Sequence, residues 1–113
     1  MRRPLRDIAL ARSGDKGAHA NVGVWVHDKT VYDALRSELT AARVAAHFAA
    51  MRPEDVERYE LPNLLAFNFV LLGVLGPGGA AGSLRTDAQA KTYAAGLLTM
   101  EVDVDFDDEV PEP

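Results

Sequence analysis

Two short stretches of the chain show regular alternation of apolar and polar residues. Val22, Val24 and Val26 alternate with glycine, tryptophan and histidine, and the stretch from Met100 to Phe106 alternates apolar with acidic residues. A period of two places successive side chains on opposite faces of a strand. We therefore expect a strand at each stretch, and we expect the second to have one dry face and one acidic face.

Three further strands are predicted from composition. Leu5 to Ala11 is typical of a short strand, and Val56 to Leu61 is mostly polar, as strands near a sheet edge often are. Phe67 to Leu75 is an almost continuous apolar run. It is too short to span a membrane and indicates a central strand covered on both faces. Pro62 and Asn63 mark a turn before it.

Two helical regions separate these strands. Apolar residues at four-residue spacing from Val31 to Leu39 form one stripe. Thr30 is a suitable N-cap and Thr40 can restart the helix, so two short helices or one kinked helix both fit. The second region follows a glycine-rich loop, 76–82. Its start is predicted by the capping-box spacing of Thr86 and Gln89.

The element order is strand, strand, helical region, strand, strand, helix, strand. This order predicts an α/β (α+β) ferredoxin-like sandwich, with a mixed or antiparallel sheet, an extra N-terminal strand and helices on one face. We expect residues 1–106 to form a single domain. The acidic tail from 107 to 113 is expected to be disordered.

Composition excludes several classes of function. The 113 residues include no cysteine, so disulfides, thiolate catalysis and iron–sulfur clusters are excluded. The net charge is −5 and the basic residues are scattered, which argues against nucleic acid as a partner. No apolar run is long enough for a membrane span, and no signal peptide is visible, so we expect a cytoplasmic protein.

The segment ARSGDKGAHANVG, residues 11–23, is the first candidate for chemistry. Gly14 and Gly17 allow the backbone to point consecutive N–H groups into one concavity, and Arg12 and Lys16 add positive charge beside it. Such a loop suits a phosphate or a carboxylate. The alternative is a polar connection between two strands, closed by an ion pair from Asp15 to a neighbouring cation.

Two other segments carry candidate residues. Asn68 lies inside an apolar run, where a buried amide must find partners, either a ligand or a neighbouring loop. Asn63 either joins that site or caps its own turn. Ser83 and Arg85 precede a predicted helix N-terminus, a pattern that fits an anion site or an ordinary capped helix after a flexible loop.

The remaining polar residues indicate no metal or cofactor. His19, His27 and His47 have no known metal-ligand spacing. The acidic residues of the last strand share a solvent face and are typical of a wet surface. No nucleophile is held against a base by spacing alone, so the residues leave open whether the chain is an enzyme.

Three stretches together resemble a known family. ARSGDKG with ANVGV, then ERYELPNLLAFNFVL, then GGAAGSLRTDAQAKTYAAGLL are similar to the C-terminal domain of AtuA-type acyclic terpene utilisation proteins, from about Leu5 to Phe106. The resemblance implies a ferredoxin-like fold without a cluster and a link to the breakdown of acyclic terpenoids and acyl-CoA thioesters. In AtuA a larger domain precedes this one, which implies here a small subunit with a large partner. Ala18 and His19 stand where the family often has a small polar or acidic residue.

These observations lead to two functional hypotheses. The first is an accessory, ligand-binding subunit that also forms homo-oligomers and binds acyl-CoA or another anionic small molecule in a polar cavity. The second is a structural assembly module that packs one face of its sheet against another chain. The first hypothesis draws its ligand-binding residues from all three segments: Arg12, Ser13, Gly14, Asp15, Lys16, Gly17, Asn21, Asn63, Asn68, Ser83 and Arg85.

Overall fold

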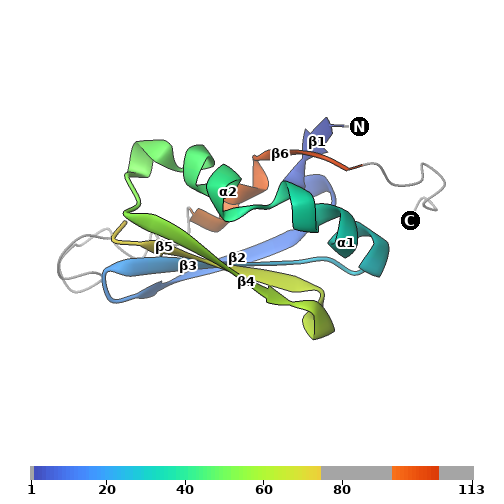
Figure 1. The fold of residues 1–113 in the computed structure, drawn as a ribbon, viewed down its shortest axis with the longest axis horizontal. Helices are drawn as coiled ribbons and strands as arrows, with labels where there is room; N and C mark the ends of the chain where they lie inside the picture. The colour runs from blue at the N-terminus through green and yellow to red at the C-terminus, as the bar shows by residue number, and fades with distance from the viewer. Residues whose placement is uncertain (1, 75–92, 105–113) are drawn as a thin grey trace.

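An antiparallel sheet of four strands carries helices on one face (Figure 1). The structure is a computed structural model that describes residues 2–74 and 93–104, and its description of residue 16 is limited to the backbone. The expected glycine-rich loop, the capping box at Thr86 and the acidic tail lie outside these residues. The strands in spatial order are β2 (Leu10–Lys16), β3 (His19–Trp25), β5 (Ala66–Leu72) and β4 (Asp55–Leu61).

The helical layer begins with two separate helices, α1 (Lys29–Glu38) and α2 (Ala41–His47). Asp28 caps α1 by accepting a hydrogen bond from the Thr30 backbone N–H, so the expected Thr30 cap was wrong by two positions. The carboxylate of Asp28 reaches this orphan donor because its own backbone is extended. Thr40 caps α2, as predicted, by accepting from the Arg43 N–H. The 3-10 turn η2 (Ala49–Met51) follows α2, and the 3-10 turn η3 (Pro62–Leu64) follows β4. Residues 93–98 are also helical.

The path from β3 through α1 and α2 to β4 is a split β-α-β unit. Both β3 and β4 are antiparallel to β5, so they are parallel to each other with β5 between them. This is the central unit of a ferredoxin-like fold, and the class predicted from the sequence is confirmed. The extra N-terminal strand is β2, which forms a hairpin with β3 and occupies the edge beside it.

The two ends of the chain form a separate small sheet. β1 (Arg2–Pro4) pairs with β6 (Glu101–Asp103), so the expectation that the last strand joins the main sheet was wrong. The edge position beside β3 is already taken by β2, whose short hairpin loop costs little closure entropy. The alternation that predicted a strand at 100–106 still describes burial, because Val102 and Val104 are buried while Glu101 and Asp103 are exposed.

The strand expected at Leu5 to Ala11 was also misplaced. Leu5–Asp7 is a 3-10 turn, η1, and strand β2 begins only at Leu10. Leu5 is fully buried and its N–H donates to the Met100 carbonyl at 2.8 Å. The turn therefore anchors the chain where it passes from the small sheet to the large one.

The core lies between the sheet and the helices. Phe67, Phe69 and Leu71 of β5 point toward the helices and are buried, and the Tyr32 ring stacks on Phe67 with centroids 4.5 Å apart. On the other face of β5, Ala66 is buried but Asn68, Val70 and Leu72 are only half-buried, so the expectation of a strand covered on both faces was wrong for most of its length. The core residues supplied by other elements include Val22, Val24, Leu35, Leu39, Val44 and Leu97.

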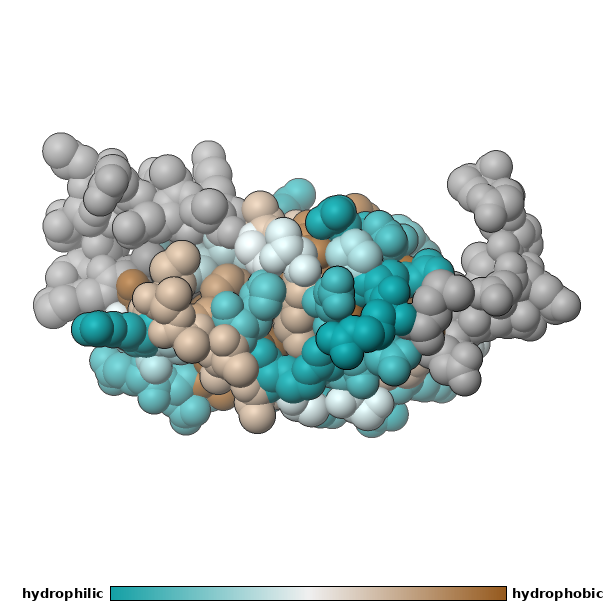
Figure 2. All heavy atoms as spheres, turned by 90° about the horizontal axis from the view of Figure 1, so that it is seen from above, coloured by the Kyte–Doolittle hydropathy of each residue, from teal (hydrophilic) through white to brown (hydrophobic). Residues whose placement is uncertain are grey.

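The outer surface of the helical layer differs from this interior. Figure 2 shows hydrophilic side chains over much of that surface and weakly hydrophobic surface toward one end. The sequence of α2, AARVAAH, consists largely of alanine, which leaves little apolar area to expose. The helical layer therefore has one strongly apolar side, which faces the sheet.

Candidate functional site

The second face of the sheet is the first candidate surface, and we call it the open face. Among the described residues, the helices lie on the opposite side (Figure 1). Side chains alternate along each strand, so the register assigns every other residue to this face. The open face consists of Leu10, Arg12 and Gly14 on β2; His19, Asn21, Gly23 and Trp25 on β3; Ala66, Asn68, Val70 and Leu72 on β5; and Asp55, Glu57, Tyr59 and Leu61 on β4.

The open face is apolar at one end. Leu10 pairs with Trp25, Trp25 with Ala66, and Ala66 with Leu61, so these four residues form one row across all four strands. Leu10 is 50% exposed and Leu61 is 40% exposed. Leu64, in the turn η3 that follows β4, is 69% exposed at the same end.

The centre of the open face is polar. The side-chain amide of Asn21 donates to Oδ1 of Asn68 across β3 and β5 at 3.4 Å. Gly14 lies opposite Asn21 on β2, and a Cβ there would come within 3.4 Å of the Asn21 amide oxygen. The structure thus brings together Asn21 and Asn68 from two of the predicted segments. One partner for the Asn68 amide is therefore another open-face side chain.

The β2–β3 hairpin closes at Gly17. Its φ of 64° is in the left-handed region, which glycine adopts without the steric cost of a Cβ. His19 connects this hairpin to the end of β5, because its Nδ1 accepts a hydrogen bond from the Gly73 N–H at 2.9 Å. The ring proton of neutral His19 is therefore on Nε2. His19, one of the two positions that differ from the pattern of the resembled family, therefore makes a contact within the fold.

Ser13 does not belong to the open face. It pairs with Val22, whose side chain points into the core, and its Oγ accepts a hydrogen bond from the Ala94 N–H at 3.1 Å. This contact connects β2 with the helix at 93–98, a segment 81 residues further along the chain. The Ser13 hydroxyl therefore binds the helical layer. No spacing rule in the sequence could have identified that partner.

The other predicted site residues are spread along the sheet. Arg12 and Asp15 are exposed, and they lie on opposite faces because they are three positions apart on one strand. Asn63 is exposed in η3, beside the β4–β5 turn, whereas the GDKG hairpin is at the opposite end of β5. Six residues of strand separate these ends, or roughly 20 Å. Lys16 is the last residue of β2, and the structure describes only its backbone. Ser83 and Arg85 lie outside the described residues.

One tyrosine on the open face has a raised pKa. The Tyr59 hydroxyl donates to Oε1 of Glu57 at 2.7 Å, and this hydrogen bond to the carboxylate raises the pKa of Tyr59 above its usual value of 10.0. Glu57 and Asp55 place negative charge on β4, at the opposite edge of the face from Arg12 on β2. The two edges of the open face therefore have opposite charge.

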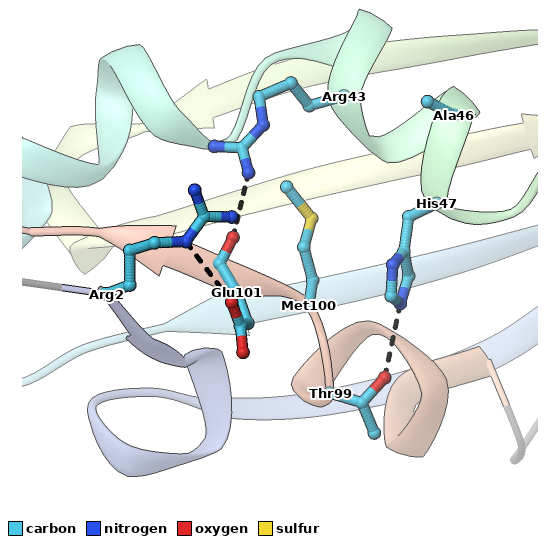
Figure 3. Close-up of a pocket in the computed structure, with 7 residues that line it drawn as sticks. All are labelled: Arg2, Arg43, Ala46, His47, Thr99, Met100 and Glu101. Atoms are coloured by element: carbon cyan, nitrogen blue, oxygen red, sulfur yellow. Dashed lines mark hydrogen bonds and ion pairs between the residues drawn. The ribbon is translucent and has the colours of Figure 1, made fainter.

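A second candidate is a cavity of about 480 Å³ between α2 and the C-terminal segment (Figure 3). None of the residues predicted from the sequence lines it. It is bounded by basic residues of α2, by the end of the helix at 93–98 and by the small sheet. The lining residues are Arg2, Arg43, Ala46, His47, Thr99, Met100 and Glu101.

The polar groups of this cavity bond to one another. Arg43 donates to Oε1 of Glu38 at 2.7 Å and to the Glu101 carbonyl at 2.8 Å. Arg2 forms an ion pair with the Glu101 carboxylate at 3.2 Å. Nε2 of His47 lies 2.8 Å from the Gly96 carbonyl, which can only accept, so this nitrogen carries the ring proton. The cavity is therefore a seam that holds α2 against the chain end.

The described residues provide no obvious metal centre. Across 2–74 and 93–104, no group of three or more His, Cys, Asp or Glu side chains is arranged to hold a metal ion. Within the same part of the chain, no helix is long and apolar enough to cross a membrane.

The split β-α-β unit and its antiparallel sheet define a ferredoxin-like α+β domain. A family model described as the AtuA ferredoxin-like domain matches residues 3–103, and the chain belongs to that family. Neither the curated proteins nor the solved structures include a significant match to the chain.

Proposed function

We propose that this domain is an accessory assembly module in acyl-CoA or acyclic-terpenoid catabolism, and that it packs the open face of its sheet against another protein chain. Membership of the AtuA ferredoxin-like family supports the metabolic setting. The single observation that supports the mechanism is the apolar row across the open face. A partner chain would bury this row and so complete a second core layer.

The apolar row is exposed at its two ends. Trp25 is half-buried at its centre, with Leu10 and Leu61 exposed on the two edge strands. Burial of apolar area stabilises an association by about 25 cal/mol per Å² before the costs of ordering are subtracted. Ala66, between Trp25 and Leu61, is buried, so the exposed apolar surface lies mainly at the two edge strands. Exposed apolar surface can mark an interaction site.

A small-molecule site for acyl-CoA or another anion is the second candidate. The observation in its favour is the Asn21–Asn68 pair, because one hydrogen bond leaves further donor and acceptor capacity on both amides. Against it, Ser13 binds the helical layer and Asn63 is at the other end of the sheet. Among the described residues, the predicted polar groups do not converge on one cavity.

Leu10 and Met51 offer a matched test of the proposed function. Their exposures are 50% and 51%, but Leu10 is on the open face and Met51 is in η2 on the helical side. We expect Leu10→Glu to abolish association of the full chain with a large AtuA-type subunit, measured by light scattering after size exclusion. We expect Met51→Glu to leave it unchanged.

The result that would overturn the proposal is equal association of the wild type and Leu10→Glu. A parallel thermal-shift titration with acyl-CoA tests the second candidate. A saturable shift that Asn68→Ala removes and Leu10→Glu leaves unchanged would favour the small-molecule site over the assembly role.

A further inference from the structure

The open face carries opposite charges on its two edge strands, and this arrangement bears on the identity of the partner. We propose that the open face packs on the open face of a second copy of this chain, related by a two-fold axis parallel to the strands. This inference rests on the proposed function and names the partner of that same face. It follows from the strand order and from the placement of Arg12 on one edge strand and of Asp55 and Glu57 on the other.

The strand order determines which edges meet. A two-fold axis that lies in the interface and runs along the strands places β2 of one copy over β4 of the other, and β3 over β5. Arg12 is at the register level of Tyr59, since Arg12 pairs with Gly23, Gly23 with Asn68, and Asn68 with Tyr59.

Arg12 of one copy then faces the acidic edge of the other. The partner's Tyr59 presents its ring and its hydroxyl, which is already bonded to Glu57. A guanidinium can stack on the ring and pair with that carboxylate in the same position. The two-fold axis makes this contact occur twice. A two-fold axis across the strands would instead place β2 over β2, with Arg12 near Arg12.

The centre of the face also fits a copy of itself. Gly23 on β3 lies under the partner's Asn68 on β5 in this arrangement. Among the described residues, a Cβ built at Gly23 meets no atom closer than the Arg12 carbonyl oxygen at 3.8 Å, which leaves space above this backbone within that part of the chain. The side chain of Asn68 can occupy that space in each direction. The apolar row meets the equivalent row, because the axis preserves position along the strands.

The size of the face sets the expected affinity. Four strands of seven residues cover roughly 19 Å by 24 Å. The footprint is about 450 Å² per copy, below the ~800 Å² per partner of a standard interface. We therefore expect a weak dimer, with a dissociation constant on the order of 10–100 µM.

Charge reversal at Arg12 and Glu57 tests the arrangement. The dimer dissociation constant is measured by sedimentation equilibrium, and emission of Trp25, the single tryptophan, reports burial of the face. We expect Arg12→Glu and Glu57→Arg each to weaken the dimer about tenfold, because each change makes two like-charge contacts. The double variant R12E/E57R restores opposite charges across both contacts and recovers most of the affinity.

A bulky side chain at Gly23 provides an independent test. Gly23→Val adds a β-branched strand former where the isolated domain has space, so the domain stays folded but the partner's Asn68 is displaced. We expect this variant to be monomeric, with the Trp25 emission of the diluted wild type. Circular dichroism of every variant confirms that the fold is intact.

Two results would overturn the inference. One is a wild-type protein that stays monomeric at millimolar concentration. The other is a double variant R12E/E57R that dimerises more weakly than either single variant, which would mean that Arg12 and Glu57 do not face each other across the interface. If either result is found, the open face does not pair with itself in this arrangement. Association of the wild type and of Leu10→Glu with a large AtuA-type subunit then tests the proposed function separately, with that subunit as the occupant of the face.

Discussion

The two faces of the same sheet differ in what holds their residues in place. On the helix-covered face, Phe67, Phe69 and Leu71 are buried against α1 and α2. On the open face, Asn68 and Val70 alternate with them along the same strand and are half-buried. Neighbouring residues on one strand thus have different environments, because successive side chains point to opposite faces of the sheet. Residues on the first face stabilise the fold, whereas Asn68 and Val70 on the second keep part of their surface in contact with solvent.

The largest expected contrast is on β5, between Phe69 and Val70. Phe69→Ala removes a fully buried ring and should lower the free energy of unfolding by about 3–5 kcal/mol. Val70→Ala removes two half-buried methyl groups and should cost about 1 kcal/mol. Urea unfolding at unchanged m value measures both. Similar losses for the two variants would contradict the distinction between the faces.

A smaller contrast is expected on β2, between Ser13 and Arg12. Ser13→Ala leaves the Ala94 N–H without its acceptor and should cost about 1–2 kcal/mol. Arg12→Ala, on the open face, should change the stability of the monomer by less than about 0.5 kcal/mol. Thermal unfolding in dilute solution separates them. A larger loss for Arg12→Ala would show that its side chain supports the fold.

The tyrosines of the two faces should differ at alkaline pH. Burial raises the pKa of Tyr32, whose hydroxyl donates to the Ala66 carbonyl at 2.9 Å, above its usual value of 10.0. The unfolded chain therefore loses this proton at lower pH than the folded chain does. The contribution of Tyr32 to stability is complete below pH 10.0 and is lost as pH rises through the folded-state pKa.

Substitution of each tyrosine isolates this effect. We expect Tyr32→Phe to flatten the decline in stability above pH 10.0, although it also removes a buried hydrogen bond and lowers stability at neutral pH. Tyr59→Phe should flatten the decline less than Tyr32→Phe does, because Tyr59 is 49% exposed and solvent screens the hydrogen bond to Glu57 that raises its pKa. Unfolding curves collected from neutral to alkaline pH provide the comparison. A profile governed by Tyr59 would contradict it.

The smallest effect is expected at exposed apolar residues. Leu10→Glu and Met51→Glu should each change the stability of the dilute monomer by less than about 0.5 kcal/mol, because both side chains already contact water. Differential scanning calorimetry at low concentration measures this. A strong destabilisation by Leu10→Glu alone would mean that the open face is covered within one chain.

Periodicity predicted the parts of the fold that depend on local order. The alternating valines form β3, the stripe from Val31 to Leu39 is buried, and the polar strand at 55–61 is at the sheet edge. Periodicity failed where a distant segment competes for the same position. Leu5 forms a turn because it bonds to Met100, and the last strand pairs with β1 because β2 holds the edge.

The candidate site was less predictable than the fold. The sequence indicated that Asn21 and Asn68 are unusual polar residues in apolar surroundings, and they do hydrogen-bond to each other. It could not show that Ser13 faces the core, because a shift of one residue in register moves a side chain to the other face. It also gave no sign of the Arg43–Glu101 contact, whose partners are 58 residues apart.

The sequence by itself determined the α/β class, the strand at the alternating valines, the buried stripe of α1 and the family, because these depend on local periodicity and on motifs within single segments. The tertiary structure alone decided which strands are neighbours, which polar residues share a face and which hydroxyl binds the helical layer. Those features depend on pairing between segments far apart in the chain, and local periodicity contains no information about register between strands.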